Sequence, residues 1–195
     1  MDTFGNLAFQ EAWREERIGG KFVMLSAPST SHNRVSGNIH SIFDRFLRGR
    51  KCEYFPDGEA LYLEEGMEEY QPDGMVVCDP DKVKEDGIHG APDLVVEVLS
   101  PSTGRYDRGH KMRVYEKHGV REYWIVSPVE RSVEQYVLEE GRLVLRNAYF
   151  QYPDFLLKHM KEEEIAAIPT EFHCTLFDEL SIPIEEIFYR VTSSQ

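Results

Sequence analysis

The sequence predicts a mixed α/β (α+β) protein ordered as helix, three strands, helix, strand, with a mixed central sheet and an added hairpin. An amphipathic helix follows residue 31, and apolar runs rich in β-branched residues are typical of strands covered on both faces. A helical segment separates two such runs, as in a crossover between parallel strands. A length of 195 residues favours one domain over 1–195, with its core at about 31–128.

The N-terminal half predicts two helices. Residues of about 4–17 are expected to be helical, and Gly19-Gly20 then turns the chain into a short strand at 21–25. The main helix follows, because apolar residues recur at helical spacing: Val35, Ile39, Ile42, Phe43, Phe46 and Leu47. It ends at 48–50, where glycine lies between two arginines.

Strands are expected next at 52–55, 59–63, 73–78 and 93–99, and the polar segment 79–92 is expected to be a loop. A helix at 107–118 and a buried strand at 122–126 follow, and the step from 93–99 to 122–126 predicts a right-handed crossover. A hairpin at 133–138 and 143–150 turns at Glu139-Glu140-Gly141, and 184–189 is expected to form a last helical turn.

Composition limits the setting of the protein. No apolar run reaches the length of a membrane helix, and the N-terminus lacks a secretory pattern. Cys52, Cys78 and Cys174 are far apart and odd in number, which favours a reduced, cytoplasmic setting with no disulfide framework and no zinc site. The net charge of −13 argues against broad nonspecific binding to nucleic acid.

One acidic residue, Glu97, lies inside the apolar run 93–99. An ionised carboxylate in a strand covered on both faces costs several kcal/mol unless it is paired, hydrogen-bonded or bound to a metal. A second acid, Asp73, opens the apolar segment 73–78, and Lys111 follows on the expected helix. Two carboxylates on strands and one amine are the components of a metal-dependent phosphodiesterase.

The alternation of side chains along a strand places Glu97 on one face with Val95 and Leu99. If the strand of Asp73 is a neighbour, the two carboxylates can meet there. Together with a backbone carbonyl, such as that of Val98, they would form an oxygen site suited to Mg²⁺ or Mn²⁺. An ammonium beside it could orient the attacking water and balance charge in the transition state.

Three segments carry a resemblance to a known family. They are Gly90-Ala91-Pro92-Asp93-Leu94-Val95-Val96-Glu97-Val98-Leu99-Ser100-Pro101-Ser102-Thr103, Tyr106-Asp107-Arg108-Gly109-His110-Lys111 and Gly119-Val120-Arg121-Glu122-Tyr123-Trp124-Ile125-Val126. The chain closely resembles the Uma-type family of putative restriction endonucleases, which belongs to the PD-(D/E)XK superfamily. The match is specific over 72–128, looser over 14–63 and weak after 150.

The resemblance implies a restriction-endonuclease-like core in which Asp73 and Glu97 are metal ligands and Lys111 is the catalytic lysine. The wider superfamily has that lysine two residues after the glutamate, where this chain has Leu99. The resemblance implies that the lysine has moved to the helix. It also suggests Glu16 and His32 as additional site residues, DNA as the substrate and a homodimer as the assembly.

Other interpretations of these residues remain open. Glu97 could be satisfied by a structural partner, Asp73 could be a turn residue after proline, and Lys111 could pair with Asp107 in solvent. Asp93 is expected to cap a strand entry rather than bind metal. The turn before the second helix could bind phosphate, with candidate residues Ser102, Thr103, Arg105 and Arg108.

The favoured function is that of a Mg²⁺-dependent endonuclease acting on DNA. The alternative is a non-catalytic binding or assembly protein on a nuclease fold, favoured by the acidic charge and by the absence of an obvious basic stripe. A third hypothesis is a metal-dependent hydrolase of nucleotides or small phosphate esters. A basic groove long enough for a duplex would separate the first from the other two.

Overall fold

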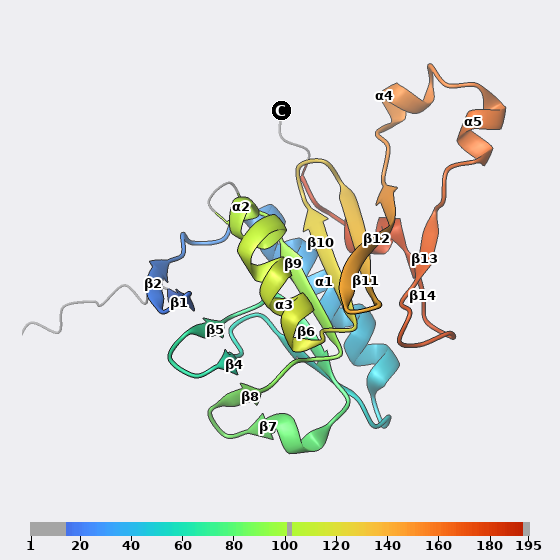
Figure 1. Ribbon diagram of the computed structural model, residues 1–195. Helices are drawn as coiled ribbons and strands as arrows, with labels where there is room; N and C mark the ends of the chain where they lie inside the picture. Colours follow the sequence, from blue (N-terminus) through green and yellow to red (C-terminus); the bar gives the residue numbers. More distant parts are fainter. Residues whose placement is uncertain (1–14, 101–102, 193–195) are drawn as a thin grey trace, which may run out of the picture.

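The computed structural model describes residues 15–100 and 103–192, which form a mixed α+β fold with two six-stranded sheets (Figure 1). We call the sheet that carries β9 and β10 the central sheet and the other the second sheet. The order across the central sheet is β12-β11-β10-β9-β6-β3. Its strands are β3 (Glu53–Pro56), β6 (Gly74–Val77), β9 (Leu94–Val98), β10 (Glu122–Ser127), β11 (Ser132–Glu139) and β12 (Arg142–Phe150).

The central sheet is mixed, as expected. β9 and β10 are parallel and joined through a helix, whereas the other neighbouring pairs are antiparallel. β11 and β12 form the expected hairpin. Counted within this sheet alone, the chain runs from a helix through β3, β6 and β9 to a second helix and β10.

The second sheet was not expected. Its order is β2-β1-β5-β4-β8-β7. Its strands are β1 (Glu15–Ile18), β2 (Lys21–Met24), β4 (Leu61–Glu64), β5 (Glu68–Tyr70), β7 (Val83–Lys84) and β8 (Gly87–His89). The segment 79–92 is therefore not only a loop, since it contains β7, β8 and a 3₁₀ turn at Pro80–Lys82.

The predicted helix at 4–17 is wrong where the structure describes it, and residues 4–14 lie outside the described part. Residues 15–18 form β1, which pairs with β2 and β5. Glu16 and Ile18 are buried while Arg17 faces outward, an alternation typical of a strand. The charged residues of β1 and β5 gave no apolar periodicity from which either strand could be predicted.

The inner strands β6, β9 and β10 are buried on both faces, because other elements cover each side of the central sheet. On one face lies α1 (Thr30–Leu47), whose N-terminus is capped by Ser29 Oγ accepting from the amide of His32 at 3.1 Å. Alternate residues of the central strands pack there, including Val96 and Trp124. On the opposite face, Val95 and Ile125 pack against the second helix and the second sheet. Glu97 belongs to this second face.

The second helix begins earlier than predicted and is irregular. It runs through α2 (Gly104–Tyr106), a π-helical turn at Asp107–Lys111 and α3 (Met112–His118), and it ends at Gly119 with φ +82°. The π turn adds one residue to the usual spacing, a feature that is frequent at functional sites.

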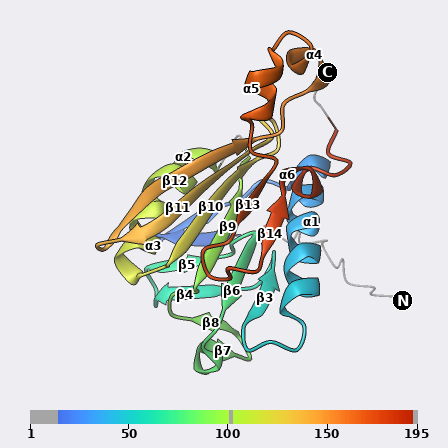
Figure 2. The same cartoon turned by 90° about the vertical axis from the view of Figure 1, so that its right-hand side faces the viewer.

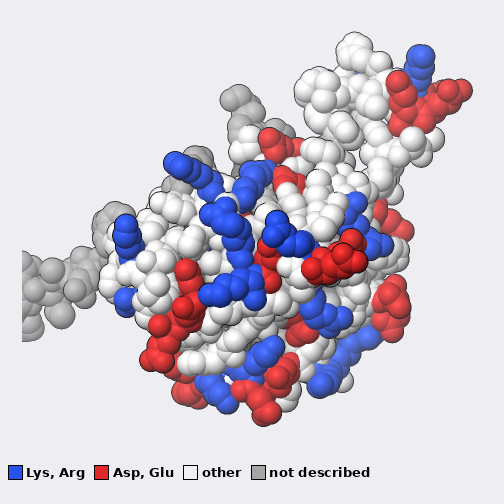
Figure 3. Space-filling view, in the orientation of Figure 1, with Lys and Arg blue, Asp and Glu red and all other residues white. Residues whose placement is uncertain are grey.

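One side of this helix is buried and carries both acidic and basic residues, whereas the other side is exposed and basic. Asp107, Lys111 and Tyr115 are buried, whereas Arg105, Arg108, Arg113 and Lys117 are exposed. In the space-filling view, Lys and Arg side chains gather over α2 and α3, with acidic side chains beside them (Figure 3). We call these four exposed residues the basic row.

The C-terminal part folds back on the face covered by α1. β13 (Glu171–His173), β14 (Ser181–Pro183) and α6 (Ile184–Ile187) place Phe172, Ile182 and Ile187 in that core, and the expected helical turn at 184–189 is present as α6. Between β12 and β13, α4 (Asp154–Leu157) and α5 (Glu162–Ala166) project from the body (Figures 1 and 2).

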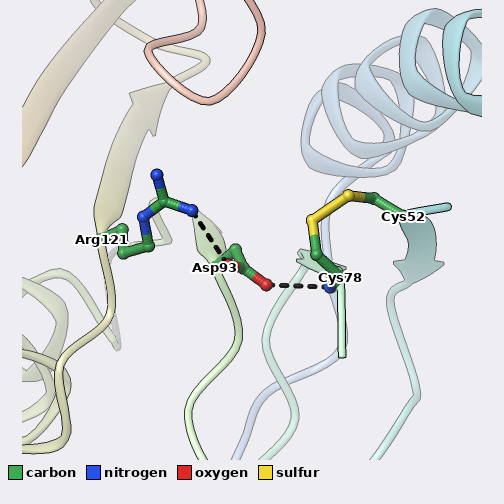
Figure 4. The surroundings of a disulfide bond; sticks show 4 residues. All are labelled: Cys52, Cys78, Asp93 and Arg121. Carbon is green, nitrogen blue, oxygen red and sulfur yellow. Dashed lines mark hydrogen bonds and ion pairs between the residues drawn. A yellow bond between two sulfur atoms is a disulfide. The ribbon is translucent and has the colours of Figure 1, made fainter. Parts of the chain in front are cut away.

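A disulfide joins Cys52 and Cys78, so the expectation of no disulfide is wrong (Figure 4). The antiparallel pairing of β3 with β6 sets the two cysteines opposite each other at the end of that pair, although 26 positions separate them in the chain. Sequence spacing cannot reveal such a contact. The disulfide removes the observation from which a reduced compartment was inferred.

Asp93 has the structural role expected of it. Its carboxylate accepts a hydrogen bond from the Cys78 amide at 2.8 Å and lies 3.3 Å from Arg121 Nη1 (Figure 4). It thus ties the entry of β9 to the end of β6.

Among the described residues, no helix is long and apolar enough to cross a membrane.

Candidate active site

The pairing of β6 with β9 brings Asp73 and Glu97 together. The register opposes Gly74 to Val96, so Asp73, directly before β6, lies level with Glu97. Asp73 Oδ2 accepts a hydrogen bond from the amide of Val98 at 2.6 Å, which fixes the carboxylate at the end of β9. Both carboxylates line one small cavity and are largely buried, with only 4% of Glu97 exposed.

Lys111 enters this site from the π-helical turn and is 2% exposed. Its Nζ donates to Glu97 Oε1 at 3.0 Å and to Glu16 Oε1 at 2.8 Å, and it lies 3.7 Å from Asp107 Oδ1. A solvated helix lysine paired only with Asp107 is therefore ruled out. The ammonium links three elements that are far apart in the sequence.

Glu16 reaches the site from β1. Its Oε1 accepts from Lys111 and also from the amide of Gln71 at 3.0 Å. Its Oε2 is buried and has no hydrogen-bond partner among the residues that the structure describes. A buried carboxylate oxygen without a donor is costly, and a cation in the cavity would relieve that cost.

Two tyrosines that sequence reasoning missed surround the lysine. Tyr115 OH donates to Glu97 Oε1 at 2.7 Å, and the ring of Tyr70 lies 5.4 Å from Lys111 Nζ. Tyr115 follows Lys111 by one helical turn, so the helix spacing could have identified it. Tyr70 could not have been found, because β5 was not predicted.

His32 lies in the first turn of α1, with its Nε2 3.2 Å from Asp73 Oδ1. The Ser36 hydroxyl, one turn further along α1, donates to the backbone carbonyl of Asp73 at 3.1 Å. α1 thus positions Asp73 from the face of the sheet opposite to Lys111. The two additional residues suggested by the resemblance, Glu16 and His32, both line the cavity.

The electrostatics of the site are dominated by an excess of carboxylates over cations. Burial raises the pKa of Glu97 well above its ordinary value, and Asp107, Glu16 and Asp73 raise it further, against the opposing effect of Lys111. Burial, assisted by Glu16 and Asp73, also raises the pKa of Asp107 to about 6. Burial alone would lower the pKa of Lys111, but the carboxylates of Glu97, Glu16 and Asp107 outweigh it and raise this pKa. Lys111 is therefore an ammonium at neutral pH.

The cavity has a volume of about 40 Å³ and is bordered by Pro28, Ser100 and Thr103 as well as the charged residues. One water needs about 10–15 Å³ of such space, so an ion and a water or two fit but a nucleotide does not. A substrate would have to present its phosphate at the rim. Of the predicted phosphate-binding residues, Ser102 lies outside the described residues and Thr103 lines the cavity. Arg105 and Arg108 point outward, and Arg108 is paired with Glu134.

The donor set is compatible with Mg²⁺, although within 15–100 and 103–192 no three His, Cys, Asp or Glu side chains are arranged to hold a metal. Mg²⁺ in phosphoryl-transfer sites is usually held by one or two carboxylates, with water and substrate phosphate completing its shell. Asp73 and Glu97 supply those carboxylates. The unpartnered Glu16 oxygen and the raised pKa of Glu97 both indicate a site short of positive charge.

A second glutamate, Glu122 on β10, is fully buried but has a different environment. Its oxygens accept from Trp124 Nε1 and Gln135 Nε2, each at 2.6 Å, and from the amide of Thr175 at 2.7 Å. These donors are neutral and lie on the face that carries the C-terminal strands. Glu122 therefore anchors that segment, whereas Glu97 faces a cavity and a lysine.

Comparison with solved structures shows that this mixed α+β fold occurs in a known crystal structure. The chain is similar to the crystal structure of a putative nuclease from Anabaena variabilis ATCC 29413, with a TM-score of 0.66, 20% identity and coverage of 89% of both chains.

The chain belongs to the Uma2 family, described as "Putative restriction endonuclease", whose model matches residues 1–165. Two similar proteins come from Synechocystis sp. (strain ATCC 27184 / PCC 6803 / Kazusa). Uncharacterized protein slr1290 is 32% identical over 67% of this chain and 70% of its own length. Uncharacterized protein sll1609 is 26% identical over 65% of this chain and 73% of its own length. The resemblance seen in the sequence is confirmed at the level of the family.

Proposed function

We propose that this protein is a divalent-metal-dependent endonuclease that hydrolyses phosphodiester bonds in DNA. One observation carries the proposal: Asp73, Glu97 and Lys111, from three separate elements, line one small cavity in a chain of the Uma2 family. The order of α1, β3, β6, β9, the second helix and β10 is consistent with a restriction-endonuclease-like core.

Asp73 and Glu97 would hold Mg²⁺ or Mn²⁺, which when bound would polarise a phosphoryl oxygen and lower the pKa of a water. The chain's own groups prepare that site. The Val98 amide and His32 orient Asp73, and Tyr115 orients Glu97 through its hydrogen bond. Rigid positioning of this kind lowers the reorganisation needed when charge develops at the phosphate.

Lys111 supplies the positive charge of the site. As an ammonium it can stabilise the charge that develops on the phosphoryl oxygens and orient the attacking water. Glu16 and Asp107 hold it in place and keep it protonated. The lysine of this chain approaches Glu97 from the helix rather than from the strand, which is the position that the resemblance implies for it.

The basic row supports a nucleic-acid substrate. It lies on the outer surface of the helix whose inner surface carries Lys111, in a protein with a net charge of −13. Arg108 and Lys117 are paired with Glu134 and Glu64, but exposed ion pairs contribute little and exchange readily for phosphate. Arg105 and Arg113 have no ion pair among the described residues.

Replacing both Arg105 and Arg113 by alanine should weaken nucleic-acid binding and reduce its salt dependence. Each lost phosphate contact lowers the slope of log K against log salt by about 0.9 for duplex DNA. Fluorescence anisotropy with a labelled duplex at several salt concentrations measures this. Arg48→Ala, an exposed arginine at the end of α1, is the matched control and should leave binding unchanged. Equal binding by all three proteins would remove the basic row from the interface.

A non-catalytic binding or assembly role on the same fold is the second candidate. The observation that favours it is the engagement of Lys111 by Glu16 and Glu97, which leaves this ammonium less available to a substrate. This role predicts a folded protein that binds a partner without metal-dependent turnover.

Metal binding separates the two candidates. We expect Mg²⁺ or Mn²⁺ to raise the melting temperature of the wild type but not of Glu97→Ala, because saturation to 100 times Kd stabilises by about 2.7 kcal/mol. Nuclease assays on duplex and single-stranded DNA then follow. If metal neither stabilises nor activates the wild type, with or without DNA, the endonuclease proposal is wrong and the binding role remains.

A further inference from the structure

The segment 151–170, which contains α4 and α5, forms an arm that has no place in the core of its own chain. None of its residues is buried, and none belongs to either hydrophobic core. Neither helix packs extensively against another described element, and both project from the body (Figures 1 and 2).

The arm nevertheless carries large apolar side chains. Phe155 is 64% exposed, Leu156 43% and Ile165 38%. On β12, the open edge strand that leads into the arm, Leu145 is 49% exposed. A concentration of exposed apolar residues on a projecting segment is typical of a protein–protein contact.

An apolar groove lies at the base of the arm. Its volume is about 560 Å³. The arm forms one wall with the apolar residues Tyr152, Leu157, Ile165, Ile168 and Pro169, and the body forms the other with Phe150, Pro183 and Ile184. The groove is formed where the arm leaves β12 and returns beside β14. The exposed side chains of Phe155 and Leu156 are not part of this lining, so they are available to contact the groove of another molecule.

The charges of the two surfaces are complementary. The first turn of α5 presents Glu162, Glu163 and Glu164. A hollow of about 610 Å³ that shares Gln151 and Glu185 with the groove is lined by Arg45, Arg131 and Arg190. Glu185 and Glu186 also line this hollow, which leaves one positive charge in excess. The pair of Glu186 with Arg45, 3.1 Å apart, is exposed and of the weak kind that an incoming carboxylate can replace.

We propose that the arm docks on a second copy of this chain, lying in the partner's groove with its acidic turn against the partner's arginines. One chain carries both the arm and the surface that fits it, so a two-fold axis makes the contact twice and closes the assembly. The arm and groove of each chain together approach the roughly 20–30 residues per side that stable interfaces use. The proposal is independent of catalysis.

Sedimentation velocity of the full chain over a range of concentrations tests it. We expect the wild type to dimerise and Phe155→Asp/Leu156→Asp to dissociate at least about 100-fold more readily, since each change acts twice in a two-fold contact. Both side chains are exposed, so the fold should survive, which circular dichroism verifies. Phe22→Asp, an equally exposed phenylalanine on β2, is the control and should remain dimeric.

Charge reversal gives a second, independent test. Glu162→Lys/Glu163→Lys/Glu164→Lys should weaken the dimer at least about tenfold, as should Arg45→Glu, and combining the two sets should recover part of the loss. A wild type that is monomeric up to about 100 μM overturns the proposal. So does a dimer that the arm substitutions leave intact.

Discussion

Lys111→Met should lower the free energy of unfolding by about 3–5 kcal/mol at neutral pH in the presence of a chelator, because it leaves buried carboxylates without their cation. Lys111 Nζ contacts Glu16, Glu97 and Asp107, all nearly inaccessible to solvent. Urea denaturation followed by tryptophan fluorescence measures the change. No other single substitution in the site removes as many charge interactions.

A double substitution distinguishes loss of pairing from loss of packing. If the ammonium acts through its charge, Glu97→Gln/Lys111→Met should be more stable than the sum of the single changes predicts, by at least about 1 kcal/mol. Removing both partners of a buried pair is far less costly than removing one. Strict additivity of the two changes would show that Lys111 and Glu97 are not coupled, contrary to the 3.0 Å contact between them.

Asp73→Asn should abolish metal-dependent cleavage while leaving the protein folded. The amide oxygen of asparagine can still accept from the Val98 amide, so the hydrogen bond at the end of β9 survives. The negative charge needed to hold a divalent ion is lost. Changes that merely orient a metal ligand already cost about 10–100-fold, so we expect a loss of more than about 100-fold in kcat/KM.

Asp93→Asn is the matched control for this change. Asp93 lies at the entry of β9, on the same face as Glu97 in the strand pattern, but it is bonded to the Cys78 amide and Arg121 (Figure 4). We expect a modest change in stability and undiminished activity. If Asp73→Asn cleaves as fast as Asp93→Asn and the wild type, Asp73 is not a metal ligand and the proposed mechanism is wrong.

The amphipathic and apolar patterns determined the central architecture. The apolar spacing of residues 35–47 fixed α1, and the apolar runs at 73–78, 93–99 and 122–126 fixed three strands buried on both faces. Alternation along β9 was enough to place Glu97 on one face with Val95, and the structure shows that Lys111 lies on that face. These features were predictable because burial imposes a period on the residues of one element.

The second sheet and the arm were not predictable in this way. β1 and β5 are short and rich in charge. They are strands because their backbones pair with each other, and their side chains Glu16 and Tyr70 contact Lys111. Their side chains are satisfied by partners distant in the sequence rather than by a periodic apolar face. Local pattern carries no record of such partners.

A carboxylate inside an apolar run pointed to Glu97 as a site residue, but the sequence did not show how it differs from Glu122, which begins the next buried strand. Glu97 and Glu122 both lie in buried strands, and only the tertiary structure shows that Glu97 faces a lysine and a cavity while Glu122 is held by neutral donors. It likewise decided that Cys52 and Cys78 are joined and that the basic row lies over Lys111. The glutamates and the cysteines share one physical reason: burial of a residue follows from its own segment, whereas the partner that stabilises the buried group is contributed by another segment.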